Sequence, residues 1–396
     1  MSLATEIFAV TAMNLRSIPR RLGNSLVIVV GIAGVVAVLI SVLAMSLSFR
    51  ATVNADGRDD RAIVLTRDAT TEYASSLSRE NVAAVMNASG IKHDARDRPM
   101  VSAEVILVAP VARRRDLSDV NVTLRGVGEQ YFVMRPELRL ASGRMFRAGN
   151  QELLVGASAR GQFAGLEIGN QVRLQDGDWT VVGSFEGGQG SRETEVIADA
   201  HTVMSAYKLE AFNSVSVMLE SEGSLTKLKE TLAQDPTITV DVRTEPEYLA
   251  TASSSVNRML RIAAYAIGSI MVLGALFAVL NCMHSAVAGR AVEIATLRAI
   301  GFAPTALAAA VLIEALLLAL LGAAIGVAIA YAAFNGTTIS TLGGALWDSQ
   351  LVYTMSISPS LVFIAIMLAC ALGLFGGLLP AIRAARSNLA DALHET

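Results

Sequence analysis

The chain has 396 residues, of which 53% are hydrophobic and only 17% are charged. Residues 51–259 hold 23 of the 32 Lys and Arg residues and 29 of the 35 Asp and Glu residues. A soluble domain carries about 25% charged residues, and a nucleic-acid-binding protein carries a basic stripe. The composition therefore argues against an ordinary soluble enzyme, a disordered chain and a nucleic-acid binder. It predicts a membrane protein with one large water-exposed domain.

Residues 1–21 predict a cytoplasmic amphipathic helix. Within residues 3–18, four apolar side chains recur near helical spacing, with Glu6 and Arg16 for the other face. Such a helix lies in the membrane surface, and Pro19 then turns the chain into the next segment. The alternatives are an extension of the first membrane span and a frayed terminus.

Four apolar stretches are long enough to cross a bilayer, since a spanning helix needs about 20 apolar residues. They are residues 22–50, 260–284, 305–334 and 358–382. Backbone polar groups in lipid must bond within their own segment, so all four are predicted to be helices. The first stretch is longer than the apolar core of a cleavable signal peptide, and no clean cleavage site follows it. A membrane span is therefore favoured over a signal peptide.

The sparse basic residues predict the orientation, because Lys and Arg accumulate on the cytoplasmic side. Basic residues precede the first span, lie between the second and third, and follow the fourth, whereas residues 335–357 contain none. Both termini, the link 285–304 and the tail 383–396 are therefore predicted to be cytoplasmic. Residues 51–259 and the short loop 335–357 are predicted to be outside.

The outer segment 51–259 has the composition of a soluble domain, with mixed strand-like and helix-like runs that predict an α+β fold. A β-rich subdomain is predicted at about residues 106–200, inserted in the rest. The strand-like runs are Ala62–Thr66, Ser102–Val108, Val120–Leu124, Leu153–Val155, Gln171–Leu174, Trp179–Phe185, Val196–Ala198, Ser214–Leu219 and Thr237–Val242. The helix-like runs are Arg79–Met86, Thr202–Tyr207 and Leu225–Leu232, with Ser78 and Ser224 as candidate N-caps.

No pattern for catalysis or metal binding stands out. The four histidines are scattered without metal-ligand spacing, and Cys282 and Cys370 both lie in apolar runs. The Gly-rich stretch Gly187–Ser191 lacks the Lys that a phosphate-binding P-loop requires, so a plain loop is predicted. We expect no catalytic residue, metal or cofactor in this chain.

Three segments carry a resemblance to a known family. The link Gly289–Gly301 resembles the Arg-x-x-Glu-Ile-x-x-Leu-Arg-Ala-x-Gly signature of ABC-transporter permeases of the MacB, LolC and FtsX type. The stretch Pro380–Arg386, followed by Ala392 and Leu393, is similar to the ending of these permeases, although their usual Pro in the next turn is absent. The outer stretch 152–183 is similar to their periplasmic core.

The resemblance implies the fold and the partners. The fold is membrane α-helical, with four transmembrane helices and a large α+β extracytoplasmic domain inserted between helices 1 and 2. In this family, described as type VII and mechanotransmitting, ATP and Mg are held by a separate ABC ATPase subunit. A second permease copy completes the complex, as a homodimer or with a sister permease. In the exporter branch, a periplasmic adaptor leads to an outer-membrane duct.

The resemblance also assigns the link to ATPase coupling and the protein to the bacterial inner membrane, in contact with the lipid bilayer. Helical spacing places Ile294 and Leu297 on one face, where they would form a plug for a groove in the partner. Arg290 and Glu293 are expected to pair on the surface. The predicted coupling residues are Arg290, Glu293, Ile294, Leu297, Arg298, Ala299 and Gly301, and the tail contributes Pro380, Arg383 and Arg386.

Glu314 is the one charged residue in the third span, and a buried charge in a membrane is costly. A proton relay needs a second such group, and the spans show none, so we expect Glu314 to pair with a polar group across the helix bundle.

The prediction is therefore a non-catalytic permease subunit, with export as the leading task. A lipoprotein-release permease is the first alternative. A membrane-anchored sensor or scaffold is the alternative from a different class.

Overall fold

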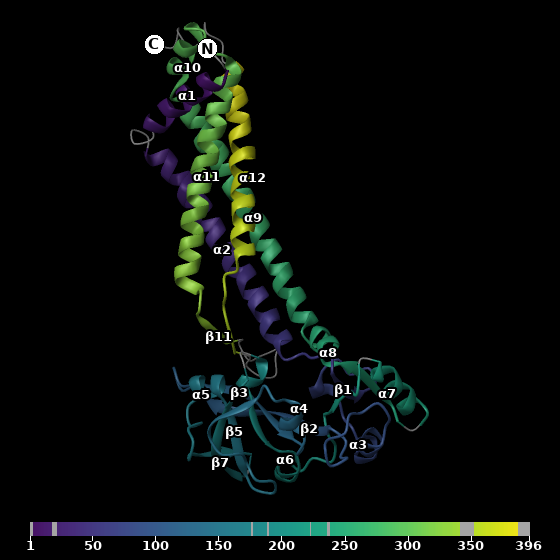
Figure 1. Cartoon of the computed structure of the whole chain (residues 1–396). Helices are drawn as coiled ribbons and strands as arrows, with labels where there is room; N and C mark the ends of the chain where they lie inside the picture. The colour runs from purple at the N-terminus through teal and green to yellow at the C-terminus, as the bar shows by residue number, and fades with distance from the viewer. Residues whose placement is uncertain are drawn as a thin grey trace. The chain divides into compact units, whose positions relative to one another are not determined.

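The computed structural model describes residues 3–17, 22–175, 177–187, 190–221, 223–235, 238–340 and 352–386 (Figure 1). The chain divides into two compact units. The helical unit comprises the described residues of 1–47, 259–337 and 355–396, and the sheet domain comprises Ser48–Arg258 with Thr338–Thr354. Pro19, Ala392 and Leu393, which entered the sequence predictions, lie outside the described residues.

Four helices are long and apolar enough to cross a membrane, in agreement with the predicted spans. They are α2 (Leu22–Ala55), α9 (Ser254–Ala288), α11 (Pro304–Phe334) and α12 (Pro359–Arg386). Two shorter helices, α1 (Leu3–Ser17) and α10 (Ala291–Ala299), complete the helical unit (Figure 1). The helix predicted near the N-terminus is present, and it packs against α11.

Glycines allow the membrane helices to approach closely. Gly326 of α11 lies against the Ala33 carbonyl and Val36 of α2, and a Cβ there would come within 2.6 Å of that carbonyl oxygen. Gly373 of α12 lies against Ala319 of α11, and a Cβ there would come within 3.0 Å of the Ala319 Cβ. These two helix pairs therefore depend on residues without a side chain.

The sheet domain is built on one ten-stranded sheet. Its strand order is β10-β1-β9-β2-β3-β8-β5-β7-β4, with β6 paired to β7. The pairs β3–β8 and β5–β7 are parallel, and the others are antiparallel. The strands are β1 (Arg61–Thr66), β2 (Val101–Ala112), β3 (Asp119–Val127), β4 (Arg139–Gly143), β5 (Glu152–Gly156), β6 (Gln171–Leu174), β7 (Gly177–Glu186), β8 (Val196–Asp199), β9 (Ser214–Met218) and β10 (Val240–Thr244).

Short helices connect these strands, which gives the predicted α+β fold. The α-helices are α3 (Arg79–Met86), α4 (Tyr131–Met134), α5 (Ala157–Gln162), α6 (Ala200–Tyr207), α7 (Ser224–Ala233) and α8 (Glu245–Ala252). The 3-10 turns are η2 (Glu72–Ala74) and η3 (Ser191–Thr194). All nine predicted strands and three predicted helices overlap elements of the structure. The strands between residues 106 and 200 continue the same sheet as the flanking strands and do not form a sheet of their own.

Three local features differ from the predictions. Strand β4 was not predicted, because its side chains are exposed or half-buried and give no apolar alternation. Ser78 caps α3 by accepting a hydrogen bond from the Asn81 amide at 3.2 Å, as predicted, but Ser224 is the first residue of α7 and Gly223 holds the cap position. The predicted loop 335–357 contains a hairpin, β11 (Thr338–Ser340) and β12 (Val352–Thr354), that belongs to the sheet domain.

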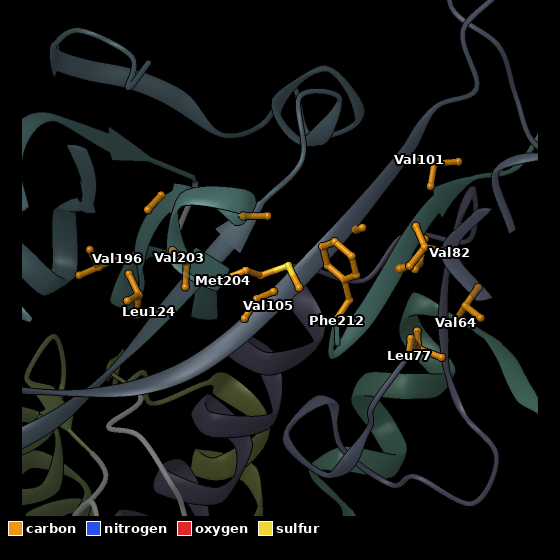
Figure 2. Packing of buried hydrophobic residues seen from close by; sticks show 14 of the residues in the cluster. Val64, Leu77, Val82, Val101, Val105, Leu124, Val196, Val203, Met204 and Phe212 are labelled. Atoms are coloured by element: carbon orange, nitrogen blue, oxygen red, sulfur yellow. The ribbon is translucent and has the colours of Figure 1, made fainter. Parts of the chain in front are cut away.

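The core of the domain runs continuously beneath the sheet. Figure 2 shows Val64, Leu77, Val105, Met204 and Phe212 in one apolar cluster, although they come from separate elements. Strands β2 and β3 carry core residues along their length, so the cluster continues from α3 to the β5–β8 half of the sheet. This shared core makes the domain one body.

Candidate functional site

Helix α10 is the centre of the candidate site, and its C-terminal end is set by Gly301, one of the predicted coupling residues. Gly301 has φ +105°, a left-handed conformation that favours glycine. The Gly301 amide donates to the Arg298 carbonyl and the Phe302 amide to the Leu297 carbonyl, each at 3.1 Å. This is a Schellman motif, which ends a helix. Pro304 then occupies the first turn of α11, where its fixed φ and missing amide hydrogen suit a helix start.

One face of α10 is buried within the helical unit and the other is exposed. Ile294 is buried beside Ala295, so the apolar face expected to meet a partner is turned inward at this position. The exposed apolar side chains are Val292, 51% exposed, and Ile300, 72% exposed. Helical spacing placed Ile294 and Leu297 on one face, but only the packing decides whether that face points inward or outward.

Arg290 lies at the cap position before α10 and is buried, not on the surface beside Glu293 as expected. Its guanidinium pairs with the Glu314 carboxylate of α11 through two hydrogen bonds of 3.0 and 3.1 Å. The same guanidinium donates to the Ser17 hydroxyl of α1 at 2.9 Å. The pairing expected for Glu314 is thus present, and its partner is a residue that had been assigned to the coupling interface.

A second polar contact joins α1 to α11. The Glu6 carboxylate of α1 accepts a hydrogen bond from the Ala303 amide at 3.1 Å. Ala303 holds the N-cap position of α11 and has no side-chain cap of its own. A carboxylate there satisfies a free amide and faces the positive end of the helix dipole. Helices α1, α10 and α11 are therefore fastened to one another at one end of the helical unit.

The tail residues continue α12. Pro380 is buried inside the helix, whereas Arg383 and Arg386 are exposed near its end. A guanidinium nitrogen of Arg383 lies 3.4 Å from Nδ1 of His284 on α9. Arg386 is the last residue of the helix, and the part of the tail beyond it lies outside the described residues.

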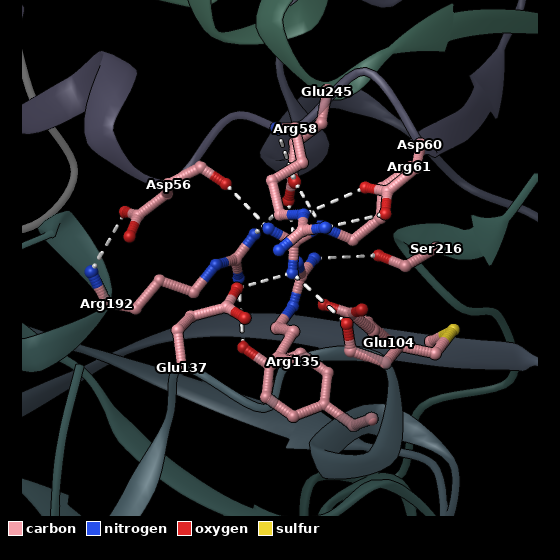
Figure 3. A network of polar contacts seen from close by, with 12 residues as sticks. Asp56, Arg58, Asp60, Arg61, Glu104, Arg135, Glu137, Arg192, Ser216 and Glu245 are labelled. Atoms are coloured by element: carbon pink, nitrogen blue, oxygen red, sulfur yellow. Dashed lines mark hydrogen bonds and ion pairs between the residues drawn. The ribbon is translucent and has the colours of Figure 1, made fainter. Parts of the chain in front are cut away.

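The sheet domain contains a buried cluster of charges that sequence reasoning missed. Arg61, Arg135 and Arg192 converge on the carboxylate of Glu245, which is completely buried (Figure 3). A second part is centred on Arg125, whose guanidinium pairs with three carboxylates: Glu72, Glu104 and Glu195. These residues come from separate segments, so no spacing in the sequence brings them together.

The pKa shifts of two buried carboxylates differ in sign: Glu72 belongs to this cluster, and Asp56 accepts a hydrogen bond from the Arg192 amide. Burial alone would raise the pKa of Glu72, but Arg125 and Arg192 lower it to about 2. Asp56 behaves in the opposite way: burial raises its pKa, although Arg192 acts against the shift. Among the described residues, no group of three or more His, Cys, Asp or Glu side chains is arranged to hold a metal ion.

Two family models match the chain. The MacB-like periplasmic core domain matches residues 22–235, and the FtsX-like permease C-terminal matches residues 265–389. No curated protein matches it.

Solved structures with a similar fold include the extracellular domain of the ABC-type transporter YknZ from Gram-positive bacteria. It is 16% identical with a TM-score of 0.36, over 46% of this chain and 100% of that one. The periplasmic region of MacB from Actinobacillus actinomycetemcomitans is 14% identical with a TM-score of 0.38, over 52% of this chain and 95% of that one.

Proposed function

The chain belongs to the MacB/FtsX family of ABC-transporter permeases, and we propose that it couples ATP hydrolysis on a separate ATPase subunit to movement of its sheet domain. As a member of this family it is a multi-pass transmembrane subunit of an ABC transporter. The chain itself carries no nucleotide-binding motif, so ATP and Mg would be held by the partner.

The construction of α10 carries the proposal. A helix that receives force from a partner must be exposed on one side and anchored on the other. Val292 and Ile300 supply exposed apolar contact. On the opposite side, Ile294 is buried and Arg290 is bonded to Ser17 of α1 and Glu314 of α11. A push on the exposed face would therefore move several helices together.

The remaining parts of the proposal follow the membrane topology. The cytoplasmic side would hold α1, α10 and the tail, and the sheet domain would lie in the periplasm. Because α2 leads into the domain and α9 leads out of it, movement of these helices would reach the domain through the chain itself. A second permease copy would complete the membrane part. Export through a periplasmic adaptor and an outer-membrane duct is the leading task, and lipoprotein release is the alternative.

The test uses the complex purified in detergent with whichever ATPase co-purifies. We expect Ile300→Glu to reduce the amount of bound ATPase at least tenfold, because a charge replaces the exposed apolar side chain at the C-cap of α10. Ile300→Val keeps the apolar surface and should bind as the parent does. Two results would overturn the proposal: no ATPase co-purifies with the parent chain, as expected for a sensor or scaffold, or Ile300→Glu binds as well as Ile300→Val.

The same preparation separates the two transport tasks. A co-purifying adaptor chain supports export, whereas bound lipoprotein without an adaptor supports lipoprotein release. Identification of every co-purifying chain by mass spectrometry gives the answer.

A further inference from the structure

The point where α2 enters the sheet domain is tied to the turn η3. Asp56 follows the last residue of α2 and is only 9% exposed. Its carboxylate accepts hydrogen bonds from the Ser191 hydroxyl and from the Arg192 amide, the latter at 3.3 Å. Gly190 lies so close to the Asp56 carboxylate that a Cβ would not fit. The exit of α2 is thus fixed to one short turn.

The segment that leads into α9 is tied to the same turn. Glu245 is the first residue of α8, and a single residue separates α8 from α9. The Glu245 carboxylate lies 2.8 Å from Arg61, 2.8 Å from Arg135 and 3.6 Å from Arg192 of η3. Arg61 also donates to the Asp56 carbonyl at 3.1 Å, so it contacts both attachments at once (Figure 3).

The hairpin between α11 and α12 also contacts η3. The hairpin β11–β12 connects α11 to α12, and β12 packs against η3. Tyr353 of β12 is buried and meets the Phe49 ring edge-on, with 5.8 Å between ring centroids. Phe49 belongs to the part of α2 that lies in the sheet domain.

On its other side, η3 is fastened to the half of the sheet that contains β5 and β7. The Glu193 carboxylate accepts hydrogen bonds from the Gly187 amide at 2.6 Å and from the Ser158 hydroxyl at 3.2 Å. Gly156, at the end of β5, packs against the Glu193 backbone with no room for a Cβ. Displacement of η3 would therefore displace these strands.

We propose that η3, together with Asp56, Arg61 and Glu245, is the junction through which movement of the membrane helices enters the sheet domain. This inference rests on the proposed function and names the positioning residues for it. The ion pairs that Glu245 forms with Arg61 and Arg135 are buried, and breaking a buried pair is costly. Apolar contacts are non-directional and permit sliding. A junction built from guanidinium–carboxylate pairs would therefore transmit a displacement instead of absorbing it.

The experiment measures movement of the domain in the complete complex with its ATPase. Spin labels are attached at Leu117→Cys in the sheet domain and Phe363→Cys in α12, both exposed positions, after Cys282 and Cys370 are replaced by Ser. In the parent, the distance distribution should change between the nucleotide-free state and the state with a non-hydrolysable ATP analogue. Glu245→Gln should reduce that change by at least half while ATPase binding is retained.

Glu104→Gln is the matched control. Glu104 is as completely buried as Glu245 and also pairs with an arginine. Among the described residues, that arginine, Arg125, forms ion pairs with Glu72, Glu104 and Glu195 and none with Asp56 or Glu245. The control should lose thermal stability and keep the nucleotide-dependent change. If Glu245→Gln fails to fold, Glu245→Asp keeps the charge and shortens the side chain, and it should show the same loss of movement.

The outcomes separate the two proposals. If the parent shows no nucleotide-dependent change, the proposed function fails and the junction fails with it. If the parent moves and the Glu245 variants move equally, only the junction is overturned. Equal losses in the Glu245 variants and in Glu104→Gln would also overturn it, because the effect would then be one of stability.

Discussion

Arg125 in the sheet domain and Arg290 in the helical unit are both buried, yet their surroundings differ. The Arg125 guanidinium makes five hydrogen bonds to three carboxylates, which uses all its donors. Arg290 pairs with one carboxylate and one hydroxyl, and its Nε has no partner among the described residues. A neutral one-to-one pair is the arrangement that a lipid-surrounded bundle tolerates, because unbalanced charge there is costly. In the sheet domain, by contrast, several arginines and several carboxylates share the pairing within one buried cluster.

Removal of Arg125 should have the largest effect, because it leaves three buried carboxylates without their main partner. We expect Arg125→Met to lower the free energy of unfolding of the domain by about 5 kcal/mol. The fluorescence of Trp179, which is fully buried, reports unfolding of the domain in detergent. Arg98→Met removes the ion pairs of a half-exposed arginine and should cost less than about 1 kcal/mol. If both variants lost a similar free energy of unfolding, the buried cluster would contribute no more to stability than the surface ion pairs do.

Acid should weaken the same cluster. The pKa of Glu72 is about 2 in the folded domain, below the ordinary value of about 4.3 that applies in the unfolded chain. As the pH falls from about 5 toward 2, the unfolded state takes up the proton first, so stability is lost by on the order of 3 kcal/mol. The raised pKa of Asp56 acts in the opposite sense, because that carboxyl gains its proton first in the folded state. Denaturation at several pH values should show a shallower acid loss in Glu72→Gln than in the parent.

In the helical unit, loss of one partner should be somewhat less severe. Glu314→Leu leaves Arg290 buried without its carboxylate and should cost about 3 kcal/mol. A cavity of about 20 Å³ beside this pair is large enough for one water molecule, which would offset part of the loss. The double variant Arg290→Met with Glu314→Leu should recover most of the stability, because no unpaired charge remains. A double variant less stable than either single one would contradict a simple ion pair.

The smallest expected loss of stability comes from a neutral hydrogen bond, the N-cap of α3, and it can be compared with the losses from the buried charges. Ser78→Ala removes the cap of α3 and should cost about 1 kcal/mol, measured by the same Trp179 signal. Ser224→Ala changes the first residue of α7 but removes no cap hydrogen bond. Its loss of unfolding free energy should therefore be smaller than that of Ser78→Ala. The reverse order would show that the cap bond is not what matters at Ser78.

The sequence by itself determined the spans, nine of the ten strands of the large sheet and the C-terminal end of α10, because each depends on neighbours in the chain. Apolar runs of bilayer length predict helices, and short apolar runs predict strands such as β1. Gly301 and Pro304 set helix boundaries through their own backbone preferences. These features hold wherever the segment lies in the fold.

Only the tertiary structure decided which charges meet and which helical face is buried. Arg290 and Glu314 are 24 residues apart, Arg125 and Glu195 are 70 apart, and no local periodicity links such positions. In the same way, spacing placed Ile294 and Leu297 together but left the direction of their face open. The physical reason is that burial and ion pairing depend on distances between different helices and strands. A sequence pattern fixes distances only within a single helix or strand.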